Sequence, residues 1–227
     1  MKNLKDIIVE RLHVNKDIKS YNYHPKTKEE LKLLINKLIG ERGNDADLND
    51  IDTSEITDMN SMFDESNFNG DISNWDVSNV KDMNHMFNES EFNGDISEWD
   101  VSNVQYMQFM FRESKFTGEN GGISNWDVSN VENMSHMFQY SKFNGDISNW
   151  DVSNVEDMYC MFRNSEFNGD ISNWNVRKVK DMRYMFCKSK FSGKNGDISK
   201  WDVSNVKDIE GMIYDSPLEK NPPKWYK

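Results

Sequence analysis

The sequence predicts an α/β repeat protein, a solenoid of short parallel strands and short helical turns with a helical N-terminal cap. Its most regular feature is a set of tryptophans 24, 27, 24, 24 and 27 residues apart: Trp75, Trp99, Trp126, Trp150, Trp174 and Trp201. Each lies in nearly the same sequence, Ile-Ser-x-Trp-Asp-Val-Ser-Asn-Val-x-x-Met-x-x-Met-Phe. The apolar residues recur in register with the tryptophans, so neighbouring units can share one core.

Within a unit, the apolar pattern changes its period. Ile72, Trp75 and Val77 follow an L-x-x-L-x-L spacing, and the alternation of Trp75 and Val77 predicts a strand. The next apolar residues step by three and four, which predicts a short helical turn: Val80, Met83, Met86 and Phe87. An Asn-Gly turn in residues 68–71 closes the unit, and the three extra residues of the longer units fall at this turn. Insertions confined to one turn leave the core spacing unchanged.

The chain divides into three regions. Residues 1–43 form a helical leader and cap, residues 44–218 a solenoid of seven repeats, and residues 219–227 a C-terminal tail. In the first region we expect one short helix over residues 4–12 and a second helix after Pro25. The second helix has a capping segment at residues 27–30, ends at Gly40 and Gly43, and should cover the first repeat. In the tail, Trp225 is expected to fold back over the last repeat.

Charge and composition exclude several classes of function. Residues 1–43 have ten Lys and Arg against six Asp and Glu, a net charge of +4, so the total of −12 leaves −16 for residues 44–227. Such an acidic body argues against a nucleic-acid partner. Cys160 and Cys187 occupy different positions in neighbouring repeats, which favours free thiols over a disulfide or a metal site. We expect no cofactor and no membrane insertion, and the lack of an export signal predicts a cytoplasmic location.

The repeat unit is similar to that of a known family. Residues 143–162, Phe-Asn-Gly-Asp-Ile-Ser-Asn-Trp-Asp-Val-Ser-Asn-Val-Glu-Asp-Met-Tyr-Cys-Met-Phe, closely resemble the repeat of BspA-like bacterial surface proteins. That group is also described as a domain of unknown function in mycoplasma and Listeria lipoproteins. The resemblance covers residues 44–218. It implies a leucine-rich-repeat-like solenoid, a role in adhesion or protein binding, a cell-surface location and no catalytic residues.

One candidate site is the aspartate that follows each repeated tryptophan. The residues are Asp76, Asp100, Asp127, Asp151 and Asp202, interrupted by Asn175. If the units stack at the spacing of parallel strands, these carboxylates lie about 4.8 Å apart along one face. They could attract a basic protein partner or weakly hold a cation, or each could be solvated or bonded to nearby backbone N–H groups. All three interpretations remain open at this stage.

A second candidate site comes from positions that vary between repeats. The two residues before the second methionine of each unit include Phe109, Tyr159 and Tyr184, and aromatic side chains are favoured in protein interfaces. The alternative is surface variation without a function. His85 and His136 are two repeats apart, roughly 10 Å, which is too far for a shared metal ion.

The sequence thus predicts a non-enzymatic repeat scaffold that binds a protein partner. Binding would use the extended strand face and the variable helical-turn residues, and a basic protein is one candidate partner. No nucleophile–base pair, phosphate-binding loop or metal-ligand set is apparent in it. Two alternatives are an acidic decoy that imitates nucleic acid and occupies a basic protein, and a surface adhesin of the BspA type.

Overall fold

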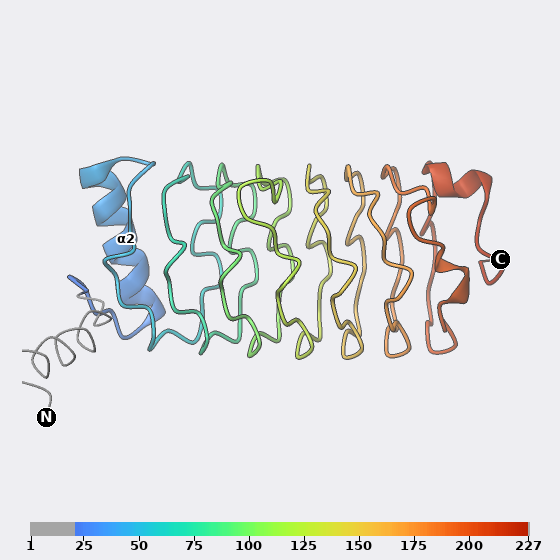
Figure 1. Ribbon diagram of the computed structural model, residues 1–227, viewed down its shortest axis with the longest axis horizontal. Helices are drawn as coiled ribbons and strands as arrows, with labels where there is room; N and C mark the ends of the chain where they lie inside the picture. The colour runs from blue at the N-terminus through green and yellow to red at the C-terminus, as the bar shows by residue number, and fades with distance from the viewer. Residues whose placement is uncertain (1–20, 227) are drawn as a thin grey trace, which may run out of the picture.

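The chain winds into a stack of similar coils along one axis (Figure 1). The computed structural model describes residues 21–226. These contain one α-helix, α2 (Lys28–Arg42), and two 3₁₀ turns, η2 (Ile198–Lys200) and η3 (Pro217–Lys220), and no β-strand. The helix expected over residues 4–12 lies outside the described residues. We number the coils 1 to 7 by the first residue of their Met-x-x-Met-Phe segments: Met59, Met83, Met107, Met134, Met158, Met182 and Ile209.

The predicted α/β solenoid of parallel strands is wrong for residues 21–226. Adjacent coils are joined by isolated parallel bridges, as between Asp58 and Asp82, and not by ladders of consecutive pairs. The Trp-Asp-Val segment is not extended either, because the Trp75 N–H donates to the Ile72 carbonyl at 3.1 Å. The Val80 N–H likewise donates to the Val77 carbonyl at 2.9 Å. The apolar alternation that predicted a strand therefore belongs to consecutive tight turns.

The expected helical turns are also absent from the Met-x-x-Met-Phe part of each coil. In coil 2, the N–H groups of Met83, His85 and Phe87 donate to carbonyls of coil 3 at 2.8–2.9 Å. Between them, Met86 and Asn88 donate within their own coil, to residues three positions earlier. Bonds to the next coil exclude a continuous helix, and the local bonds of the intervening residues curl the backbone, so an extended strand cannot form either. We call residues 83–90 of coil 2 and their equivalents the turn segment.

Two positions in every turn segment have a left-handed backbone. In coils 1 to 6 they are the residue before the second methionine and the residue four positions later, as in His85 and Glu89. Thirteen residues other than glycine have φ between 51° and 60°: Ser61, Glu65, His85, Glu89, Phe109, Glu113, His136, Tyr140, Cys160, Asn164, Tyr184, Lys188 and Asp215. Gly211 completes the set in coil 7 with φ 59°. The left-handed residues reverse the chain within each segment, so that the methionines and phenylalanines point inward.

Stacked aromatic rings form the core. Phe87 and Phe111 are fully buried, and their ring centroids lie 5.7 Å apart with nearly parallel planes. The same contact joins Phe63 to Phe87 and continues along the coils to Phe186. The repeated tryptophans are 3–5% exposed, and each indole N–H donates to a backbone carbonyl of the preceding coil. The tryptophans therefore space the coils, as the sequence predicts, and their rings are not available to a partner.

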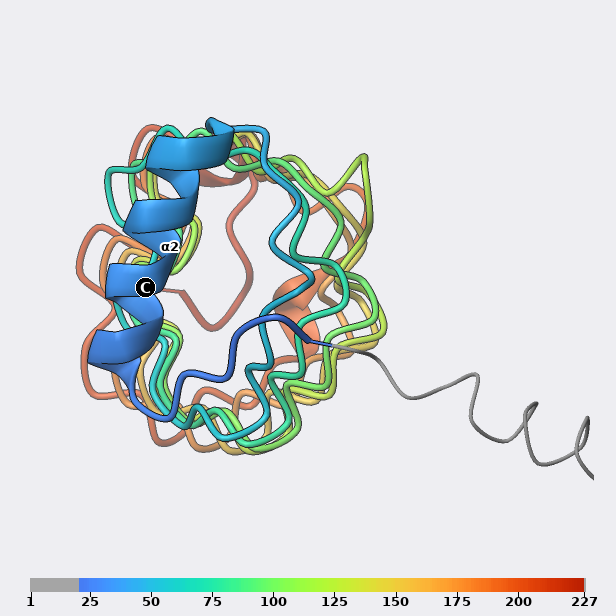
Figure 2. The same ribbon diagram turned by 90° about the vertical axis from the view of Figure 1, so that its left-hand side faces the viewer.

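The two ends of the stack are covered differently. Helix α2 lies against coil 1 and buries Leu31, Ile35 and Leu38 (Figure 2). Its N-cap is Thr27, which accepts from the Glu30 N–H at 3.2 Å, so the predicted helix and its N-cap are confirmed. Gly43 is the C-cap as expected, whereas Gly40 lies inside the helix and does not end it. At the other end, the Trp225 indole N–H donates to the Ile198 carbonyl at 3.0 Å. The ring stacks on Trp201, so Trp225 occupies the tryptophan position of a further coil, as expected.

Candidate interaction surfaces

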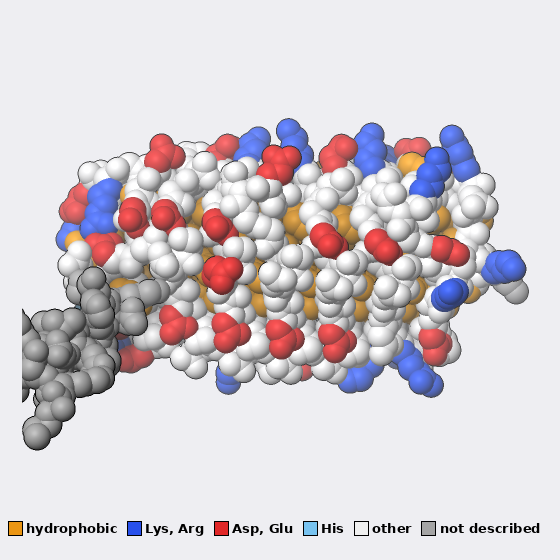
Figure 3. Space-filling view, in the orientation of Figure 1, with side chains coloured by type: hydrophobic (Ala, Val, Ile, Leu, Met, Phe, Trp, Pro, Cys, Tyr) orange, Lys and Arg blue, Asp and Glu red, His pale blue; other side chains and the backbone are white. Residues whose placement is uncertain are grey.

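The aspartates after the tryptophans form an exposed row, which we call the Asp row: Asp76, Asp100, Asp127, Asp151 and Asp202. In coil 6, Asn175 takes the same position. Acidic side chains form rows along the face shown in Figure 3, with Lys and Arg concentrated at its upper and lower edges. The sequence analysis missed Asp52, which has the same position in coil 1 and contacts His24 at 3.1 Å. Asp52 follows Ile51, which takes the place of the tryptophan in coil 1, so the Trp-Asp pair does not mark it.

Each carboxylate of the Asp row has a structural partner in its own coil. Asp127 accepts from the Ser129 N–H at 3.0 Å, and the other four aspartates accept from the serine two residues later at 3.0–3.1 Å. The Ser129 hydroxyl and N–H lower the pKa of Asp127 below its ordinary value, because both stabilise the ionised form. Asn175 accepts from the Arg177 N–H at 3.3 Å, which shows that an amide can replace the carboxylate. The local bond involves one carboxylate oxygen of each aspartate, and in Asp202 the other oxygen lies 3.5 Å from the Arg177 Nε.

A second surface, on the turn segments, brings aromatic rings of five coils into one line. We call it the ring row: His85, Phe109, His136, Tyr159 and Tyr184. Phe109 stacks on His85 at 4.5 Å and on His136 at 4.2 Å between ring centroids, with planes within 12° of parallel. Tyr159 meets His136 edge-on at 4.8 Å and Tyr184 edge-on at 6.4 Å. The three aromatic residues singled out from the sequence therefore belong to one row, which the two histidines make continuous.

All five rings are half-buried, and their orientation limits what they can contact. Both faces of Phe109 are covered by its neighbours, so its edge is what a partner can meet. The guanidinium of Arg183 lies 5.0 Å from the centre of the Tyr159 ring, and that of Arg163 lies 5.7 Å from the centre of Tyr184. The Tyr184 hydroxyl donates to Glu210 at 2.9 Å. The row is therefore a ridge of ring edges bordered by arginines.

His136 is the most enclosed polar group of the ring row. Its Nδ1 lies 2.6 Å from the Gln139 side-chain oxygen, with Arg112 and Arg163 nearby. Burial lowers the pKa of His136, and the two arginines lower it further, whereas the Gln139 contact and Asp157 raise it. The sequence analysis considered His85 and His136 only as metal ligands. Their place before the second methionine puts them in register with Phe109 in the sequence, and the structure adds that the three rings stack.

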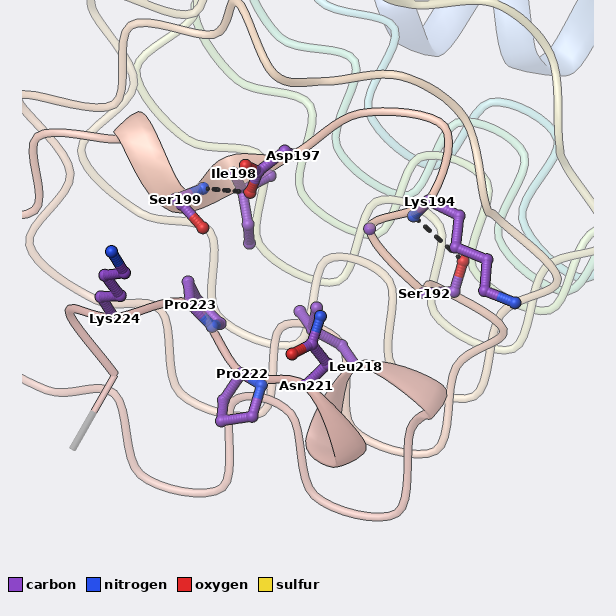
Figure 4. A pocket seen from close by; sticks show the side chains of 11 residues that line it. Ser192, Lys194, Asp197, Ile198, Ser199, Leu218, Asn221, Pro222, Pro223 and Lys224 are labelled. Carbon is purple, nitrogen blue, oxygen red and sulfur yellow. Dashed lines mark hydrogen bonds between the residues drawn. The ribbon is translucent and has the colours of Figure 1, made fainter.

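Two concave regions are relevant to these surfaces. One lies at the N-terminal end of the Asp row, where Asp76, Asp100 and Tyr21 line a shallow pocket. A cleft of about 430 Å³ opens at the C-terminal end, where Pro222 and Pro223 lie opposite Asp197 and Ser199 (Figure 4). The Asp197 carboxylate there accepts from the Ser199 N–H at 2.8 Å, which is the same turn bond as in the Asp row. Within residues 21–226, no group of three or more His, Cys, Asp or Glu side chains could hold a metal ion. Cys160 and Cys187 are buried and free, and burial raises the pKa of both thiols.

The described part of the chain has no helix with the length and apolar character needed to cross a membrane. In comparisons with known proteins, no curated protein and no solved structure matches the chain. One family model matches it twice, over residues 34–122 and 114–225, and together these ranges cover nearly all the coils. The chain belongs to the family described as Mycoplasma protein of unknown function, DUF285.

Proposed function

We propose that this chain is a non-enzymatic repeat scaffold that binds a protein partner through the ring row. The observation that carries the proposal is the continuity of five half-buried rings across coils 2 to 6. The core does not need these rings, because the methionines and phenylalanines of each turn segment already fill it. Half-buried aromatic side chains lose little conformational freedom on binding and are favoured at the centre of protein interfaces.

The test is affinity capture from the native host with a matched pair of variants. In the first variant, Phe109, Tyr159 and Tyr184 are replaced by Ser. In the control, three exposed residues outside the ring row, Lys115, Lys142 and Glu166, are replaced by Ser. We expect the wild type and the control to retain the same protein and the ring-row variant to lose it. Equal retention by all three chains would refute a role for the ring row.

A second candidate, the acidic decoy, is favoured by the density of charge. Residues 44–227 have a net charge of −16. Seven coils at about 4.8 Å span roughly 34 Å, or one net charge per roughly 2 Å. This is close to the charge per roughly 1.7 Å of double-stranded DNA. A decoy would bind a basic nucleic-acid-binding protein with a steep salt dependence. Replacement of the five aspartates of the Asp row by Asn should abolish such binding while leaving binding through the ring row intact.

A third candidate is adhesion of the BspA type. The support for it is the likeness of the repeat unit in residues 143–162 to the repeat of BspA-like surface proteins. An adhesin must reach the cell surface, so immunodetection of the chain on intact host cells tests it. Labelling confined to permeabilised cells would exclude this role.

A further inference from the structure

The ring row lies in a part of the surface whose charge is opposite to that of the whole chain. We compare the charge at four positions of each turn segment, which we call the outward slots. They are the two residues before the second methionine and the two residues after the following phenylalanine, as in residues 84, 85, 88 and 89. The charged residues in these slots are half-buried or exposed, whereas some uncharged ones, such as Cys160 and Cys187, are buried. Across coils 3 to 6 the charged residues in these slots are Arg112, Arg163, Arg183 and Lys188 against Glu113, a net charge of +3. The same slots of coils 1, 2 and 7 contain Asp64, Glu65, Glu89, Glu210 and Asp215, a net charge of −5.

Two of the four cations are already paired. Arg112 forms ion pairs with Glu89 and Glu113, and Arg183 forms ion pairs with Asp181 and Asp208. Within residues 21–226, Arg163 and Lys188 have no ion pair, and the buried Nε of Arg163 has no hydrogen-bond partner. The Arg163 guanidinium lies over the Tyr184 ring and beside the Cys160 thiol, and no carboxylate of the described residues neutralises its charge.

We propose that the turn-segment surface of coils 3 to 6 binds an acidic protein segment. In the complex, carboxylates of the partner pair with Arg163 and Lys188 on coils 5 and 6. Apolar side chains of the same segment rest on the ring edges of Phe109 and Tyr159 on coils 3 and 5. The inference rests on the proposed protein-binding function and names the chemistry of the partner. It differs from the expectation of a basic partner, which was drawn from the Asp row.

The arrangement of the rings favours a peptide over a nucleic acid. Single-stranded nucleic acids bind by stacking their bases on exposed aromatic faces. Both faces of Phe109 are covered at 4.2 and 4.5 Å, so no base can stack there without separating the row. The chain as a whole has a charge of −12, which repels a phosphate backbone along its length more strongly than it repels a short peptide.

The test is fluorescence anisotropy of the purified chain with labelled probes of defined chemistry. The probes are a short peptide of alternating Glu and Leu, the same peptide with Lys in place of Glu, and an oligothymidylate. We expect binding of the Glu-Leu peptide alone, weakened by salt. Arg163→Gln and Lys188→Gln should each weaken it about fivefold, and Phe109→Ser should weaken it as well. The control Lys142→Gln removes an exposed cation of coil 4 outside the outward slots and should leave binding unchanged.

Several outcomes would overturn the inference. These are equal binding of the Lys-Leu peptide, binding of the oligothymidylate, or Glu-Leu binding that Lys142→Gln weakens as much as Lys188→Gln does. Self-association that is lost both in Arg163→Gln and on neutralisation of the Asp row would identify a second copy as the occupant. If the Glu-Leu peptide does not bind but a host protein is still retained through the ring row, the acidic partner is wrong and the protein-binding proposal stands. Melting curves of each variant, compared with the wild type, establish that the chain remains folded.

Discussion

At the scale of single residues, the repeat is maintained by backbone conformations and side-chain bonds that recur in every coil. The left-handed residues require φ near 55°, which disfavours any side chain with a Cβ. Aspartates such as Asp127 fix the corners by accepting from the N–H two residues later. Hydrogen bonds to the next coil stabilise the left-handed positions. At Glu65, for example, the N–H donates to the Asn88 carbonyl at 2.8 Å. Local strain is therefore tolerated where it completes the contacts between coils.

Glycine should stabilise the chain at a left-handed position and destabilise it elsewhere in the same coil. Glu65 is exposed and has φ 54°, so Glu65→Gly removes a strain of about 1–2 kcal/mol and adds about 0.5–1 kcal/mol of entropic cost. We expect a rise in melting temperature of about 2 °C. In the control Asn67→Gly, two residues away and without positive φ, the melting temperature should fall. Calorimetry measures both melting temperatures. If the melting temperatures of Glu65→Gly and Asn67→Gly shift in the same direction, this explanation is wrong.

The burial of His136 predicts a loss of stability in mild acid. Its pKa in the folded chain is lowered from the ordinary value of about 6.5, so the unfolded chain takes up the proton first as the pH falls. The free energy of unfolding should therefore be highest above pH 6.5 and decrease as the pH falls from there toward the folded pKa. His136→Phe keeps the stacked ring and should remove this part of the pH dependence in urea titrations. The pKa of Asp127 is lowered as well, but its contribution is lost only below about pH 4 and should remain in the variant.

At the scale of one coil, tight turns replace regular secondary structure. The coil that begins at Asp71 closes turns at Trp75, Val80 and Met86, each through an N–H bond to the carbonyl three residues earlier. Acidic or amide side chains accept N–H groups at its corners, as Asp71 does from Ser73 and Asp82 from Asn84. Repeated aspartates at these positions therefore have a structural reason to recur, independent of any partner.

The corner role of Asp127 can be separated from its charge. Asp127→Asn keeps the acceptor for the Ser129 N–H, as Asn175 does for the Arg177 N–H in coil 6, and should change stability by less than about 0.5 kcal/mol. Asp127→Ala removes the acceptor and should lower the free energy of unfolding by about 1 kcal/mol. Denaturant titration measures both. If Asp127→Asn lowered the free energy of unfolding as much as Asp127→Ala, the carboxylate charge and not the hydrogen bond would stabilise the corner.

At the scale of the whole molecule, stability depends on contacts between neighbouring coils. A coil in the middle contacts two neighbours through its phenylalanine rings and backbone N–H groups, whereas coil 7 has one complete neighbour and the short tail that contains Trp225. Val203, Val206 and Ile209 of coil 7 are accordingly only partly buried. Stacks of this kind unfold as sums of unit and interface terms, so their ends open first.

Equivalent substitutions should therefore act differently along the stack. Met137 and Met212 are both fully buried at the same position of coils 4 and 7. Met137→Ala should lower the free energy of global unfolding by about 3 kcal/mol, because it weakens two interfaces. Met212→Ala should mainly open the C-terminal end. Hydrogen exchange would show faster exchange confined to residues near 209–226 in the second variant, and faster exchange across all coils would contradict the nearest-neighbour description.

The sequence by itself determined the period, the core and the capped start of the stack. A tryptophan or methionine that is buried in one unit is expected to be buried in the others, because repeated units share the same interface. Helix α2 could be found from its capping residues, Thr27 and Gly43. Position in the repeat also selected Phe109, Tyr159 and Tyr184 as candidates.

Only the tertiary structure decided the backbone and the composition of the surfaces. Hydrogen bonds between coils place residues such as Phe109 in the left-handed region, a conformation that is uncommon for a bulky aromatic residue. The same contacts replaced the expected strands and helical turns with tight turns. They also aligned residues 24 to 27 positions apart, which created the ring row and placed the Arg163 guanidinium over the Tyr184 ring. Contacts over that separation form only when the coils stack, so the sign of charge around the rings could not be inferred from composition.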